Sequence, residues 1–119
     1  MAHILVVEES ESRRYFIIRT LENAGHAVAA ADRADAALAL MAHGRYDLLL
    51  TNDIPSASEG VALAKRVLEI NPEIHVLLTT WDAAAAEAVI DRLPPTVRVY
   101  PKPLELGEMV SRVESALAA

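Results

Sequence analysis

Five short apolar runs constrain the fold of this chain most, because each is followed by a longer segment with apolar residues at helical spacing. Hydrophobic residues at consecutive positions are typical of parallel strands that are buried on both faces. We expect strands at residues 4–7, 27–30, 48–51, 74–78 and 97–100. The repeated order of strand and helix predicts an α/β fold, with a five-stranded parallel sheet, right-handed crossovers and helices on both faces.

The segments between these runs carry their own signals for helix ends. We expect helices at residues 12–24, 34–43, 60–70, 83–93 and 104–117. Gly25 and Gly44 follow the first two helices, where glycine commonly ends a helix. Asp82 stands where it can cap the fourth. The 119 residues are therefore accounted for by a single domain.

Composition narrows the class of protein and of partner. The chain is 53% hydrophobic but only 4% aromatic, which predicts a core of aliphatic side chains. A net charge of −6 disfavours binding to nucleic acid or to an anionic membrane surface, so we expect a protein partner. The absence of cysteine excludes disulfides and thiolate chemistry. Without a signal peptide or an apolar run near the ~20 residues that span a bilayer, we expect a cytoplasmic protein.

Polar residues follow four of the expected strands at the edge where parallel sheets bind ligands. These residues are Glu8 and Glu9, Asn52 and Asp53, Thr79 and Thr80, and Lys102. Carboxylates bind Mg²⁺, while a hydroxyl and an ammonium group can hold the oxygens of a phosphoryl group. The set predicts a small site that handles phosphoryl groups. No glycine-rich phosphate loop is present, which argues against a nucleotide site.

Four stretches of the chain together resemble the receiver domain of bacterial two-component response regulators. They are "ILVVEES", "YDLLLTNDIPSASEGVALA", "VLLTT" and "YPKP", and the resemblance covers residues 1–119. It implies a flavodoxin-like (βα)5 domain that accepts a phosphoryl group from a histidine kinase on an aspartate after the third strand. It also implies Mg²⁺ held by the acid pair Glu8 and Glu9, and contacts to the phosphoryl group from Thr80 and Lys102. The signal would pass to the face formed by the fourth helix, fifth strand and fifth helix.

The acceptor position departs from the family pattern. Family members typically read D-L-x-L-x-D-x-x-M-P-x-x-D-G here, and an alignment without gaps from Asp47 to Gly60 puts the acceptor position on Asn52. An amide is a poor phosphoryl acceptor, because its nitrogen lone pair is delocalised and its oxygen carries no full negative charge. Asp53 would take the position only through an insertion and a compensating deletion. Since neighbouring side chains on a strand face opposite sides, we expect only one of the two to reach the site unless the strand bulges.

Other positions depart in the same direction. Glu9 is longer than the family's usual aspartate, which weakens a Mg²⁺ site shared with Asn52 or Asp53. Trp81 follows Thr80 where the family prefers a small residue, and it could cover the site, anchor a partner or pack on the fourth helix. The family's switching aromatic falls on Val99, with Tyr100 one place late and expected to face the other side of the sheet. We expect Trp81, Val99 and Tyr100 to mark the partner face.

Three functional interpretations remain open from the sequence. The first is a pseudo-receiver, not an enzyme, that acts by protein contact with a histidine kinase or another signalling protein and has Asn52 at a degenerate phosphorylation site. The second is a receiver in a phosphorelay that is phosphorylated on Asp53 through a shifted register. The third is a small enzyme that acts on a phosphorylated metabolite, for which the chain offers few catalytic groups.

Overall fold

The computed structural model describes residues 1–53, 56–90 and 93–119, in which strands and helices alternate. The strands are β1 His3–Val7, β2 Ala27–Ala31, β3 Leu48–Asn52, β4 His75–Thr80 and β5 Val97–Pro101. The helices are α1 Glu11–Asn23, α2 Ala34–His43, α3 Ala57–Ile70, α4 Ala83–Ile90 and α5 Leu106–Ala118. All ten elements were expected from the sequence, although the expected fourth helix included residues 91 and 92, which lie outside the described residues. No helix in the described ranges is long and apolar enough to cross a membrane.

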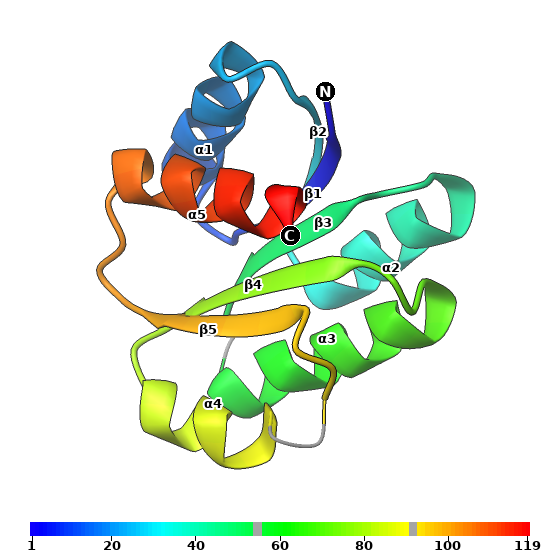
Figure 1. Ribbon diagram of the computed structural model, residues 1–119, viewed down its shortest axis with the longest axis vertical. Coiled ribbons are helices and arrows are strands. Elements are labelled where there is room, and N and C mark those ends of the chain that lie inside the picture. Colours follow the sequence, from blue (N-terminus) through cyan, green and yellow to red (C-terminus); the bar gives the residue numbers. More distant parts are fainter. Residues whose placement is uncertain (54–55, 91–92) are drawn as a thin grey trace.

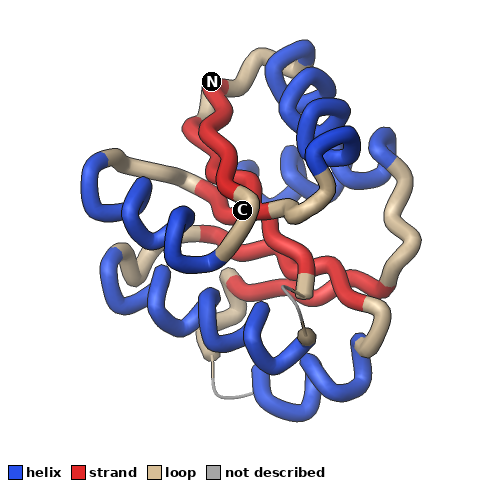
Figure 2. The backbone as a smooth tube through the Cα atoms, turned by 180° about the vertical axis from the view of Figure 1, so that it is seen from behind, coloured by secondary structure: helices blue, strands red, loops and turns tan. Residues whose placement is uncertain are grey.

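The five strands form one parallel sheet in the order β2-β1-β3-β4-β5. Helices α1 and α5 cover one face of the sheet, and α2, α3 and α4 cover the other (Figures 1 and 2). The prediction of a flavodoxin-like (βα)5 fold is therefore confirmed.

Strand β1 shows why the central strands read as continuous apolar runs. Ile4 and Val6 pack in the cluster beneath α1 and α5, whereas Leu5 and Val7 pack in the cluster beneath α2 and α3. Each of these side chains is almost completely buried. Truncating Ile4 or Leu5 to alanine is expected to cost about 2–5 kcal/mol of unfolding free energy. The buried sheet therefore holds in place the residues that follow its strands.

Helix α3 begins earlier than expected and packs tightly on the end of β3. Ser56 caps it, because its Oγ accepts a hydrogen bond from the backbone N–H of Glu59. In the first turn, a Cβ atom added to Gly60 would lie 2.8 Å from Leu78 Cδ1 and 3.1 Å from the carbonyl oxygen of Asn52. Only a residue without a side chain allows this approach, so Gly60 helps to set where β3 ends.

Candidate functional site

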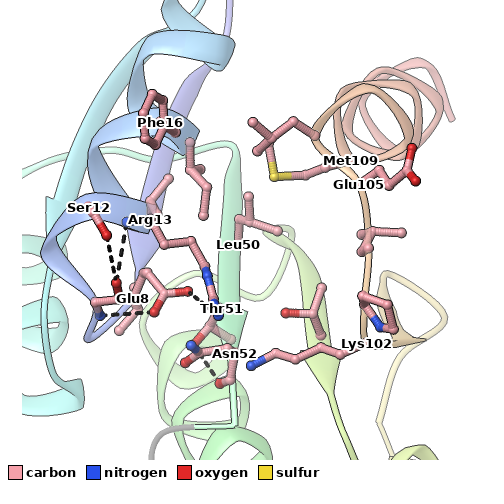
Figure 3. A pocket seen from close by; sticks show the side chains of 18 of the residues that line it. Glu8, Ser12, Arg13, Phe16, Leu50, Thr51, Asn52, Lys102, Glu105 and Met109 are labelled. Carbon is pink, nitrogen blue, oxygen red and sulfur yellow. Dashed lines mark hydrogen bonds and ion pairs between the residues drawn. The ribbon is translucent and has the colours of Figure 1, made fainter.

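The polar residues predicted from the sequence gather at the carboxyl edge of the sheet. Asn52 pairs with Thr79 and Thr80 pairs with Pro101, so β3, β4 and β5 end at the same level. A cavity of about 550 Å³ adjoins this edge, between the beginnings of α1 and α5 (Figure 3). Its floor includes Leu50, and Asn52 and Lys102 lie at its polar end.

Asn52 is the last residue of β3 and points toward the acid pair. Asn52 is only 3% exposed, and its Nδ2 donates a hydrogen bond of 2.8 Å to Glu9 Oε1. Its Oδ1 is buried without a hydrogen-bond partner among the described residues. An amide N–H therefore faces Glu9.

Asp53 follows β3 and points toward the other half of the site. Its Oδ1 lies 3.3 Å from Lys102 Nζ, and its Oδ2 accepts hydrogen bonds from Thr80 Oγ1 at 2.9 Å and from the Trp81 backbone N–H at 3.3 Å. Burial alone would raise the pKa of Asp53, but the Thr80 hydrogen bond, the Lys102 charge and the backbone N–H groups together lower it. Asp53 is consequently a carboxylate at neutral pH, and both of its oxygens are engaged.

We expected only one of the neighbouring side chains Asn52 and Asp53 to reach the site, and the structure corrects this expectation. Asn52 is the last residue paired in β3, so strand alternation does not determine the direction of Asp53. Asn52 faces Glu9, whereas Asp53 faces Thr80 and Lys102. Both side chains reach the cluster, and the one beside the lysine is Asp53.

Thr80 connects Asp53 to the start of helix α4. Its residue is completely buried, and its Oγ1 accepts a hydrogen bond of 3.0 Å from the Asp82 N–H while donating to Asp53. Asp82 in turn accepts from the Ala85 N–H at 3.1 Å, which confirms the predicted helix cap. Sequence reasoning missed this chain of hydrogen bonds. Its one signal in the sequence was the position of Thr80, two residues before the capping Asp82.

Two arginines at the beginning of α1 surround the first acid of the pair, and both were missed from the sequence. Glu8 is 3% exposed, and its Oε2 accepts a hydrogen bond from the Ser10 N–H. Its Oε1 lies 3.9 Å from Arg13, and its backbone carbonyl accepts a hydrogen bond of 2.8 Å from Arg14. The only sequence signal was the position of two basic residues in the turn that follows an acidic strand end.

This arrangement does not fit a Mg²⁺ ion. Mg²⁺ prefers carboxylate and water oxygens in near-octahedral geometry. Here Glu9 receives the Asn52 amide N–H, and Glu8 has a guanidinium group nearby. Within the described ranges, no three acidic or histidine side chains are grouped to hold a metal ion.

Of the three residues expected on the partner face, Trp81 follows β4, whereas Val99 and Tyr100 lie on opposite faces of β5. Trp81 is 69% exposed, and Lys102 Nζ lies 5.9 Å from the centre of its ring, so the indole lies beside the site. Val99 packs with the cluster beneath α4, and Tyr100 packs with the cluster beneath α1 and α5. The expectation that Tyr100 faces away from Val99 is confirmed.

Comparison with known proteins gives a consistent match in sequence. The family model described as the response regulator receiver domain matches residues 4–114. The response regulator receiver protein CpdR of Brucella abortus is 31% identical over 119 residues, which are 100% of this chain and 99% of CpdR. The DNA-binding transcriptional regulator NtrC of Azospirillum brasilense is 28% identical over 98% of this chain, which spans only 24% of NtrC.

Solved structures agree with the sequence matches. The non-phosphorylated HemR receiver domain from Leptospira biflexa superimposes with a TM-score of 0.85 at 24% identity, covering 100% of this chain and 96% of that one. NtrX from Brucella abortus, solved with ADP, gives a TM-score of 0.83 at 26% identity and covers 98% of this chain and 27% of that one. Receiver domains commonly bind Mg²⁺ at the phosphorylation site. The chain belongs to the response regulator receiver domain family.

Proposed function

We propose that this receiver domain acts in two-component signalling by protein contact and forms no aspartyl phosphate. The observation that supports this proposal is the position of Asn52, which is buried at the end of β3 with its amide against Glu9. In the ungapped alignment this is the acceptor position. An amide there offers no carboxylate oxygen to attack a phosphoryl donor, so the position is chemically inert toward acyl phosphate formation.

The partner in this proposal is a histidine kinase or another signalling protein. Trp81 is the exposed anchor, because a largely exposed indole offers an apolar surface to a partner. Val99 and Tyr100 pack on opposite faces of β5, so the proposed contact surface depends on Trp81. The net charge of −6 favours a basic protein surface over nucleic acid or an anionic membrane. In this proposal the domain works in the cytoplasm and has no enzymatic activity of its own.

Phosphorylation on Asp53 is the second candidate, because Asp53 lies beside Thr80 and Lys102. These are the two residues that the family resemblance assigns to the phosphoryl group. However, both oxygens of Asp53 now touch the donors directly. An acyl phosphate forms on one carboxylate oxygen, so phosphorylation would have to displace either Lys102 from Oδ1 or Thr80 and the Trp81 N–H from Oδ2.

Incubation with Mg²⁺ and acetyl phosphate, read by intact mass, separates these candidates. The native chain is expected to gain no phosphoryl group, and Asn52→Asp is the matched variant that restores a carboxylate at the acceptor position. An adduct on the native chain that disappears in Asp53→Asn would overturn the proposal in favour of the second candidate. Steady consumption of the donor without an adduct would instead support an enzyme that acts on phosphorylated compounds.

A further inference from the structure

Three hydrogen-bond donors from two strand ends converge on the carboxylate of Asp53. Thr80 Oγ1 and the Trp81 N–H bind Oδ2 at 2.9 and 3.3 Å, and Lys102 Nζ binds Oδ1 at 3.3 Å. A hydroxyl, a backbone N–H and an ammonium group around one point form a site for an anion. The chain itself supplies the anion.

The direction of the Thr80 hydroxyl hydrogen follows from its other partner. Thr80 Oγ1 accepts the Asp82 N–H, so its own hydrogen is available to Asp53, which as a carboxylate can only accept. Thr80 is completely buried, so no water competes for this bond. The side chains of Asp53 and Lys102 are also mostly shielded, with exposed fractions of 15% and 11%. Such shielding strengthens the attraction between them relative to a surface ion pair.

The same contacts fix the segment that leaves β4. The N–H of Trp81 and, through Thr80, the N–H of Asp82 are both tied to Asp53. Asp82 then caps α4 through the Ala85 N–H. From this anchored segment the Trp81 indole points outward and lies beside Lys102. One carboxylate therefore orients an exposed aromatic side chain and the first turn of a helix.

We infer that Asp53 is a permanent internal ligand that fills the anion site formed by Thr80, the Trp81 N–H and Lys102 and thereby holds Trp81 in its exposed position. This inference rests on the proposed function, in which no phosphoryl group enters the site. It assigns Asp53 a regulatory role: the contact surface at Trp81 is always presented, and external anions are excluded from the site.

Vacating the site tests the inference. Inorganic phosphate is titrated into the native chain, Asp53→Ala and Asp32→Ala, and the backbone NMR signals of Trp81 and Lys102 are followed. Asp32 is the matched control, because it also follows a strand but pairs with Arg33 at the surface. Phosphate is expected to shift both signals saturably in Asp53→Ala and to bind at least about tenfold more weakly to the native chain and the control, because a charged competitor has been removed only in Asp53→Ala. Adding Lys102→Met to Asp53→Ala should abolish this binding.

Phosphate binding by Asp53→Ala that is no tighter than binding by the native chain would overturn the inference. If Asp53→Ala does not fold, the isosteric Asp53→Asn replaces it, with hydrogen exchange as the measurement. Its Trp81 amide should then exchange about tenfold faster than in the native chain, because a bond to a charged acceptor is weakened. An unchanged exchange rate would equally overturn the inference. Inorganic phosphate carries no activated phosphoryl group, so these results do not depend on whether acetyl phosphate modifies the native chain. Failure of the proposed function would be detected separately, as a phosphoryl adduct in the intact-mass experiment with acetyl phosphate.

Discussion

Replacing Asn52 by aspartate should destabilise the domain at neutral pH and make its stability depend on Mg²⁺. Asn52 is buried, and its Nδ2 donates a hydrogen bond of 2.8 Å to the carboxylate of Glu9. The substitution removes that donor and places a second carboxylate against the first. A divalent cation between the two would relieve the repulsion.

Two contributions determine the loss of unfolding free energy in Asn52→Asp. Losing a hydrogen bond to a charged group costs about 1.5–3 kcal/mol. Two like charges about 4 Å apart repel each other by about 4 kcal/mol at an effective dielectric constant of about 20. Protonation of one carboxyl limits the repulsion, so we expect Asn52→Asp to lower the unfolding free energy by about 2–4 kcal/mol in total. Mg²⁺ at a hundred times its dissociation constant would restore about 2.7 kcal/mol.

Urea unfolding at neutral pH, with and without Mg²⁺, measures both effects. Asn71→Asp is the matched control: Asn71 Nδ2 donates to the backbone carbonyl of Tyr46, and this pair lies at the opposite end of the sheet from Glu9. The control should lose some stability but should not respond to Mg²⁺. If Asn52→Asp is as stable as the native chain without Mg²⁺ and indifferent to the ion, the placement of Asn52 against Glu9 is refuted.

Two further predictions concern packing and pH. Gly60→Ala should lower the unfolding free energy by about 1–2 kcal/mol in urea titrations, because its Cβ would lie 2.8 Å from Leu78 Cδ1 and the gain in helix propensity offsets only part of the cost; a stabilised variant would contradict the close contact. Desolvation, with the nearby Arg98 charge, lowers the pKa of His75 below its ordinary value of about 6.5. The neutral His75 therefore contributes its full stability above pH ~6.5, and this contribution is lost as the pH falls through the lowered pKa. His75→Gln should flatten the fall in unfolding free energy on acidification. His43→Gln, at an exposed position, should leave that fall unchanged.

The fold was predictable because its signals are local. Continuous apolar runs such as residues 48–50 are typical of strands that are buried on both faces of a covered parallel sheet, and the turn residues between the runs limit the ends of the helices. The exception is the start of α3, where the Ser56 cap adds a turn before Gly60. A capping serine in a polar loop is a weak signal, since serine is common in loops.

The members of the candidate site were also predictable, because every parallel strand ends at the same edge. Their pairing was not. The contact of Asp53 with Thr80 depends on the path of the chain after the last ladder pair of β3, where alternation no longer applies. Arg13 and Arg14 reach Glu8 only because α1 turns back over the end of β1. Contacts of this kind depend on tertiary geometry that spacing does not encode.

The most direct test of an internally filled site is to offer the native chain a phosphoryl analogue. NMR spectra are recorded with Mg²⁺ and beryllofluoride, which binds carboxylates in the manner of a phosphoryl group. Because Asn52 offers no carboxylate and the oxygens of Asp53 are engaged, the amide signals of Thr80, Trp81 and Lys102 should remain unchanged. Saturable shifts of these three signals in the native chain, lost in Asp53→Asn, would show that Asp53 binds the analogue and that the site is not filled internally.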